Sequence, residues 1–237
     1  MSAAPISKID YKSWIMSMAQ EHACYSHPLF ARLKDQSRPI SRAQAGLVLK
    51  NYDAHASHLR RLLLKACTLM PEKAVGFILE NVRNEYGNGN ADGRHQLQLQ
   101  DLAYKSGTTP RDYVAMPVKS GIKHFIKKVT PYYYPPANRV LNDRYKSKAG
   151  IAAGAITATE ILAIEEFKAL QIAFTPFGLT QHIWFDHVTV ECEHTDESIS
   201  LALYFAERGH KDSVKWGMEG VLNANLSLYD GLLACLS

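Results

Sequence analysis

The sequence predicts an all-α protein, built as a single-domain bundle of seven or more helices. Two observations carry this prediction. Apolar residues recur at helical spacing along most of the 237-residue chain, and no convincing run of alternating apolar and polar residues indicates a strand. No internal repeat, low-complexity tract or flexible linker divides the chain. Residues 1–237 are therefore expected to form one domain.

The N-terminal half shows clear signals for where helices begin and end. Ser41 and Gln44 have the spacing of a capping box, which predicts the start of a long helix. Pro71 suits the start of the next helix, which reaches Glu85 before the glycine- and asparagine-rich residues 87–93 break it. The helices expected in this half span about 11–24, 28–34, 41–69, 71–85 and 94–105.

The C-terminal half continues the helical pattern. Tyr132 to Pro136 is expected to form a stiff aromatic connector, and Pro176 and Gly178 are expected to end a long alanine-rich helix. Asp196 is positioned to cap a helix of its own. The expected helices span about 118–129, 145–174, 180–194, 196–206 and 211–236.

Composition indicates an ordinary soluble globular protein, with 46% hydrophobic and 21% charged residues. The net charge of +4 is modest and the basic residues are scattered, which argues against a nucleic-acid partner. Residues 1–11 lack the apolar core of a signal peptide, and no apolar run is long enough to span a membrane. The four cysteines form no C-x-x-C pair, so a cytoplasmic protein with reduced thiols is expected.

The most informative motif is H-x-x-x-E-x-x-H, formed by His187, Glu191 and His194. Positions i, i+4 and i+7 fall on one stripe of an α-helix. Two imidazoles and a carboxylate on such a stripe are suitable ligands for a first-row metal such as iron. The surrounding residues are largely apolar or aromatic, where ionisable groups are costly unless they are paired or metal-bound.

Three further residues are candidate ligands. Glu85 ends an apolar helix and His95 follows the glycine-rich loop, so both side chains can reach one metal, although a surface pair is the simpler reading of these two alone. Glu160 lies in an almost uncharged helical segment, where a carboxylate must be protonated, paired or metal-bound. Glu165 and Glu166 precede a lysine and are interpreted as solvated.

Three carboxylates and three histidines from three parts of a helical bundle suit a dinuclear iron or manganese site. A ferritin-like bundle would need two E-x-x-H motifs, and the chain has one among these candidates. In type and order the set resembles the heme-oxygenase-like diiron oxidases and oxygenases, from about residue 40 to the end. The matching residues are Glu85, His95, Glu160, His187, Glu191 and His194.

This resemblance implies a heme-oxygenase-like fold, two Fe(II) ions, O₂ as co-substrate and oxidation of a small organic substrate, with an amino acid favoured. Many members have aspartate where this chain has Glu191. The glutamate and the chain length are similar to members that form nitriles from halogenated tryptophan. Conversion of dibromotryptophan to an indole-3-carbonitrile is therefore the specific expectation, with fatty-acid oxidation and N-oxygenation as alternatives. An external electron donor and a homodimer are left open.

Three rival interpretations stay open at this stage. A metal-free, thiamin-related enzyme of the same fold would use a cysteine, for which Cys192 is the nearest candidate, although packing is its favoured role. A true heme oxygenase would use His22 or His27 as the axial ligand. A non-enzymatic interaction protein would use the polar residues as buried pairs.

The substrate pocket is weakly defined by the sequence. Lys50 or Arg60 has the charge to pair with a substrate carboxylate, but surface solvation is the favoured interpretation of each. Aromatic residues could line a pocket, with core packing favoured for most of them. They are Tyr132, Tyr133, Tyr134, Phe174, Phe177, Trp184 and Phe185.

Overall fold

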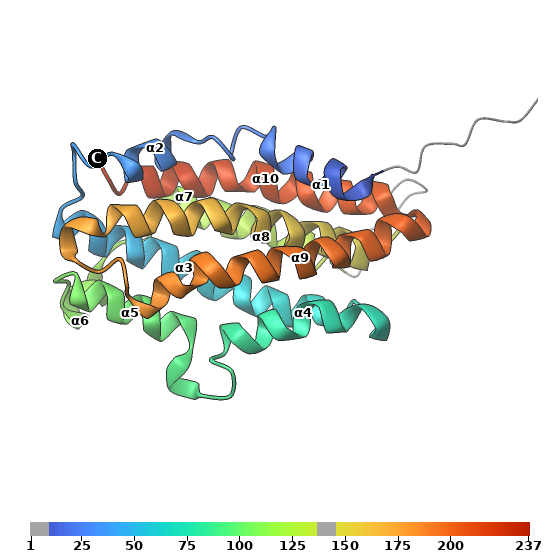
Figure 1. Cartoon of the computed structure of the whole chain (residues 1–237), viewed down its shortest axis with the longest axis horizontal. Helices are drawn as coiled ribbons and strands as arrows, with labels where there is room; N and C mark the ends of the chain where they lie inside the picture. Colours follow the sequence, from blue (N-terminus) through green and yellow to red (C-terminus); the bar gives the residue numbers. More distant parts are fainter. Residues whose placement is uncertain (1–9, 137–145) are drawn as a thin grey trace, which may run out of the picture.

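The computed structural model describes residues 10–136 and 146–237, and within the latter range it does not describe the side chains of residue 187 and residues 189–193. Throughout the described part, every regular element is helical. The long helices lie roughly along one axis of an elongated bundle (Figure 1). The all-α prediction is therefore confirmed.

The helix boundaries follow the sequence signals closely at several points. Ser41 accepts a hydrogen bond from the Gln44 amide while the Gln44 side chain accepts from the Ser41 amide, which completes the predicted capping box of α3. The described helices are α1 (Tyr11–Gln20), α2 (Pro28–Lys34), α3 (Arg42–Cys67), α4 (Glu72–Glu85), α5 (His95–Lys105), α6 (Pro110–Ala115), α7 (Ser120–Tyr133), α8 (Lys148–Ala173), α9 (His187–Phe205) and α10 (Lys211–Leu233).

Helix α8 is the central helix of the bundle. It packs against α2, α7, α9 and α10, and most of its residues are buried. Gly154 and Gly217 bring α8 and α10 into backbone contact. A Cβ atom at Gly154 would overlap the carbonyl of Val214, and one at Gly217 would overlap the carbonyl of Ile151. This close approach explains why so much of α8 consists of small residues.

The region around α9 differs from the prediction. Two helices were expected over 180–194 and 196–206, but one helix runs from His187 to Phe205, preceded by 3₁₀ turns at Thr175–Phe177 and Ile183–Asp186. The Asp196 carboxylate contacts Lys12 at 3.2 Å, so it does not cap a new helix. A π-turn at Ala206–His210, with Gly209 at φ 85°, joins α9 to α10.

Three smaller differences concern helix ends. Helix α7 continues through Pro131 to Tyr133, so the start of the expected connector is helical. Pro131 has no backbone N–H to donate to the preceding turn, and α7 ends two residues beyond it. Helix α6 was not predicted, and α1 ends at Gln20 rather than near residue 24.

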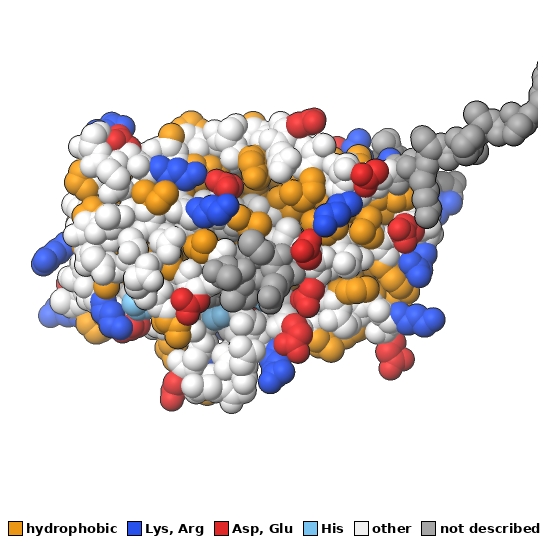
Figure 2. Space-filling model, in the orientation of Figure 1, with side chains coloured by type: hydrophobic (Ala, Val, Ile, Leu, Met, Phe, Trp, Pro, Cys, Tyr) orange, Lys and Arg blue, Asp and Glu red, His pale blue; other side chains and the backbone are white. Residues whose placement is uncertain are grey.

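The basic residues are scattered over the visible surface, as the sequence indicated (Figure 2). Figure 2 shows Lys and Arg side chains interspersed with Asp and Glu over the visible face, without a large patch of one sign. In the part of the chain that the structure describes, no helix is long and apolar enough to cross a membrane.

Candidate functional site

A cavity of about 80 Å³ lies inside the bundle, lined by residues of α3, α4, α5, α7, α8 and α10 and by Trp184. Its wall combines aromatic rings with an unusual number of ionisable side chains. These include His55, Arg60, Glu85, His95, Glu160 and Glu166. Three of the six predicted metal ligands, Glu85, His95 and Glu160, therefore border one cavity.

Glu85 and His95 lie side by side, with 3.2 Å between Glu85 Oε1 and His95 Nδ1. Helix α4 ends at Glu85 and α5 begins at His95. The chain reverses between them through Gly87, Asn88 and Gly89, all three of which have positive φ. The structure thus brings together the two residues that the sequence alone paired only weakly. Metal binding by them remains a prediction.

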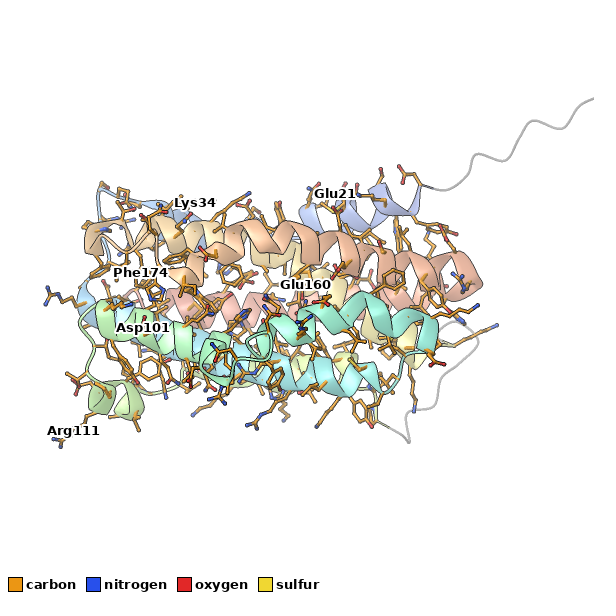
Figure 3. All side chains as sticks on the ribbon, turned by 60° about the horizontal axis from the view of Figure 1, so that its bottom comes forward. Glu21, Lys34, Asp101, Arg111, Glu160 and Phe174 are labelled. Carbon is orange, nitrogen blue, oxygen red and sulfur yellow. The ribbon has the colours of Figure 1, made fainter. Side chains whose placement is uncertain are left out.

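Glu160 points inward from the middle of α8, and 6% of the residue is exposed. Its Oε1 accepts a hydrogen bond of 2.8 Å from Nδ2 of Asn81 on α4. The Thr195 hydroxyl on α9 donates to the Glu160 backbone carbonyl at 3.1 Å. Figure 3 shows the Glu160 side chain extending from α8 toward α4. Glu160 therefore lies where α4, α8 and α9 meet.

His194 is buried on α9, directly before Thr195. The side chains of His187 and Glu191 lie outside the described residues, so their arrangement remains a prediction. The backbone of α9 is helical from His187 onward, which keeps the i, i+4, i+7 spacing of the motif. Among the side chains that the structure describes, no three histidine, cysteine or acidic residues gather closely enough to hold a metal.

The donor set nevertheless fits iron in type. Carboxylate and imidazole groups are the ligands that non-heme iron uses, and they come from two sides of one cavity. Helix α9 packs against both α4 and α8, the helices that carry Glu85 and Glu160. Metal binding by residues of α9 remains a prediction.

Glu166 corrects the sequence interpretation, which treated it as solvated. Only 7% of it is exposed, and its two carboxylate oxygens accept hydrogen bonds from Tyr52 at 2.9 Å and Tyr229 at 2.6 Å. Burial raises the pKa of Glu166, opposed by the two tyrosine hydroxyls. Glu165 is the more exposed neighbour and pairs with Lys34 and Lys168. The burial of Glu166 was not predicted, because Glu165 and Lys168 lie close to it in the sequence and indicate a solvated segment.

Arg60 is a second correction, because 8% of it is exposed and it lines the cavity. Its Nη2 donates to Gln96 Oε1 at 3.3 Å, and its Cζ lies 5.2 Å from the centre of the Tyr86 ring. Lys50 instead stacks on Tyr113, with 4.9 Å between Nζ and the ring centre, and does not line the cavity.

His55 is a cavity residue that the sequence analysis did not identify. It is 3% exposed, and its ring lies edge-to-face with Tyr52 at 4.4 Å between centroids. Burial lowers the pKa of His55 to about 3, so the imidazole is neutral at physiological pH. The available signal was its helical spacing from the apolar residues Val48, Tyr52, Leu59 and Leu62 of α3.

Most of the candidate aromatic residues pack in the core, as favoured. Phe174 contacts both Phe177 and Phe185, and Tyr132 contacts Trp216. Tyr133 and Trp184 are the two that line the cavity.

The two histidines proposed as axial ligands of a heme oxygenase, His22 and His27, are engaged in other contacts. His27 caps α2 by accepting from the Leu29 amide, and its other ring nitrogen lies 3.3 Å from Asp230. Both ring nitrogens of His22 are also engaged, by Cys24 and Asn223. Neither histidine lines the cavity.

A cysteine-based enzyme would need a reactive thiol at the cavity. The described cysteines, Cys24, Cys67 and Cys235, do not line it. Burial raises the pKa of Cys24 to about 12 and that of Cys235 to about 11, which suppresses the thiolate. The side chain of Cys192 lies outside the described residues.

Comparison with solved structures identifies the fold. A CADD-like protein of unknown function from Nostoc punctiforme PCC 73102 superposes with a TM-score of 0.72 at 14% identity, covering 96% of this chain and 97% of its own. A domain of unknown function with a heme oxygenase-like fold from Shewanella denitrificans OS217 gives 0.69 at 14% identity, covering 98% and 94%. The fold is heme-oxygenase-like.

A TenA family transcription regulator from Silicibacter sp. TM1040 shares the same fold, with a TM-score of 0.68 at 12% identity over 96% of this chain and 97% of its own. Neither a protein-family model nor a curated protein sequence matches the chain. At these identities the similarity establishes the architecture, and function has to be argued from the cavity.

Proposed function

We propose that this protein is a non-heme diiron enzyme that uses O₂ to oxidise a small organic substrate. The observation that carries the proposal is the convergence of Glu85, His95 and Glu160 on one buried cavity. Helix α9, which bears the H-x-x-x-E-x-x-H motif, packs against the helices that carry two of them. Two bound Fe(II) ions would supply the electrons and the coordination sites needed for O₂ reduction.

The proposed ligands are Glu85, His95, Glu160, His187, Glu191 and His194. Asn81 donates a hydrogen bond to one oxygen of Glu160 and thereby orients its carboxylate, as hydrogen-bond partners of metal ligands do. His95 and Glu85 are already in contact, so little side-chain ordering is needed when they bind a cation. The rings of Trp184, Tyr52 and Phe167 pack together, and Trp184 also lies edge-to-face with the His95 ring.

Iron content tests the proposal directly. The purified chain is loaded anaerobically with Fe(II), desalted and assayed for bound iron. We expect about two ions per chain and a loss of at least one ion in Glu160→Ala. Glu165→Ala is the matched control, because it removes a partly exposed carboxylate of the same helix that pairs with Lys34. Equal iron content in both variants, or no iron in the wild type, contradicts the proposal.

The finer proposal concerns the substrate. We infer an amino acid, with conversion of a halogenated tryptophan such as dibromotryptophan to an indole-3-carbonitrile as the specific case. The aromatic lining of the cavity supports a ring-bearing substrate. Oxygen consumption by the iron-loaded protein with tryptophan, halogenated tryptophans and a fatty acid, followed by mass spectrometry, tests it. If only the fatty acid is oxidised, the proposed amino-acid substrate is wrong and a fatty acid takes its place.

A further inference from the structure

Arg60 is a buried cation on the wall of the cavity. Among the residues that the structure describes, no carboxylate lies within ion-pair distance of its guanidinium, and its buried Nε has no hydrogen-bond partner. Its polar neighbours are the neutral amide of Gln96 and the ring of Tyr86. A buried charge is costly when unpaired, so this environment is incomplete without an anion.

The carboxylates that line the same side of the cavity are engaged elsewhere. Asp53 accepts hydrogen bonds from the Tyr113 hydroxyl at 3.0 Å and from the Ser57 hydroxyl at 2.7 Å. Glu85 contacts His95. Arg60 thus lines the cavity while its buried Nε has no hydrogen-bond partner among the described residues.

We propose that Arg60 is the anchor for the carboxylate of an aromatic α-amino acid bound in this cavity. A guanidinium binds a carboxylate through two parallel hydrogen bonds, and Nε with one Nη is a suitable pair of donors. This inference rests on the proposed function, because the anchored amino acid is the substrate of the proposed diiron enzyme.

The surroundings favour this class of ligand over other anions. Glu85, Glu160 and Glu166 also line the cavity, so a doubly charged phosphate would meet like charge, whereas an α-ammonium group would be attracted. Tyr52, Phe167 and Trp184 offer aromatic faces for a ring.

The position of Arg60 also suits a substrate of the proposed metal centre. Two neighbours of Arg60 directly follow the proposed ligands in sequence: Tyr86 follows Glu85, and Gln96 follows His95. A carboxylate held at Arg60 would place the rest of the amino acid beside the Glu85–His95 pair.

Ligand binding to the metal-free protein tests the inference without relying on turnover. L-tryptophan, tryptamine and inorganic phosphate are titrated against the wild type, Arg60→Met, Arg60→Lys and the control Arg61→Met, by calorimetry. Arg61 is the next residue of α3 and is exposed. We expect tryptophan affinity to fall at least tenfold (about 1.4 kcal/mol) in Arg60→Met, to fall less in Arg60→Lys and to stay unchanged in Arg61→Met.

Tryptamine lacks the carboxylate, so it should bind more weakly than tryptophan and be insensitive to Arg60→Met. Without ligand, Arg60→Met should melt no lower than the wild type, because it removes an unpaired buried charge and keeps an apolar side chain of similar length. A purely structural role predicts a lower melting temperature.

Three results would overturn the inference: equal losses in Arg60→Met and Arg61→Met, phosphate binding as tightly as tryptophan, or no tryptophan binding to the wild type with and without anaerobic Fe(II). Iron content is measured in parallel and should be the same in Arg60→Met and wild type. Arg60-dependent tryptophan binding by a protein that takes up no iron would leave the anchor standing and reject the diiron function.

Discussion

Glu166 and Arg60 are both buried, ionisable and placed on the same cavity, yet their surroundings differ. Both oxygens of Glu166 are occupied by hydroxyl groups of Tyr52 and Tyr229. Among the described residues, Arg60 contacts the neutral amide of Gln96 and the ring of Tyr86, and its Nε has no hydrogen-bond partner. Burial alone therefore does not distinguish structure from function. The carboxylate is completed by the fold, whereas the guanidinium is left for a ligand to complete.

The largest expected effect on stability follows from removing the Glu166 carboxylate. Glu166→Ala should lower the free energy of unfolding by about 3 kcal/mol or more, because two buried tyrosine hydroxyls lose their acceptor and a cavity is left behind. Urea denaturation of the metal-free protein, followed by circular dichroism, measures this change.

Glu165→Ala provides the comparison for that measurement. Glu165 is partly exposed and pairs with Lys34 and Lys168, so its removal should cost about 1 kcal/mol or less. If the two variants lose the same stability, the assignment of Glu166 as an internal structural group is wrong.

The second largest effect is a loss of stability at acidic pH that comes from His55. The pKa of His55 is lowered to about 3 in the folded protein, against an ordinary value of 6.5, because the ring is buried. Between these values the unfolded chain binds a proton that the folded chain does not, so stability falls as pH drops below 6.5. At pH 5 the loss from this residue is about 2 kcal/mol.

His55→Phe should reduce this acid sensitivity, since phenylalanine keeps a ring between Tyr52 and Phe125. Unfolding free energies at pH 7 and pH 5 measure it, and exposed His124→Gln is the control. An unchanged pH dependence in His55→Phe would show that the imidazole takes up its proton in the folded protein.

A smaller effect distinguishes the two tyrosines of the Glu166 environment. Tyr229→Phe removes the shorter of the two hydrogen bonds and should cost about 1–2 kcal/mol, with Tyr52→Phe somewhat less. Thermal melts of both variants and of their combination measure the difference. No loss in either variant would mean that water replaces the hydroxyls, which is not expected at a fully buried carboxylate.

The smallest effect is expected at the partly exposed ion pair between Lys34 of α2 and Glu165 of α8. Lys34→Ala breaks a contact of 3.1 Å with Glu165, and both side chains are partly solvated. The free energy of unfolding should change by about 0.5 kcal/mol or less, and 0.5 M salt should remove the difference. A loss as large as that of Tyr229→Phe would weaken the contrast between exposed and internal charges.

Local signals in the sequence were sufficient for most of the fold. The Ser41–Gln44 capping box and the Pro28 start of α2 are short-range rules, and both are observed. The single α9 was not predicted, because Asp196 resembles a cap in sequence while its carboxylate contacts Lys12, 184 residues away. Local sequence patterns do not indicate a contact between residues so far apart in the chain.

The candidate site was predictable only in part, for the same reason. Glu160 is surrounded by apolar residues along α8, which indicated its burial. Glu166 and Arg60 have charged neighbours in sequence and were therefore interpreted as solvated, although three-dimensional packing buries both. Neighbours from α5 and α10, such as Gln96 and Tyr229, decide their environment, and no local pattern encodes those distances.

The glycine contact between α8 and α10 limits how this cavity can be reshaped. Any side chain at Gly154 or Gly217 would push the two helices apart, and Glu160 and Glu166 move with α8. Redesign of the cavity for a larger molecule should therefore begin on the opposite wall. Leu63 of α3 and Leu99 of α5 line the cavity there, and shortening them would add volume while leaving the helix that carries both glutamates in place.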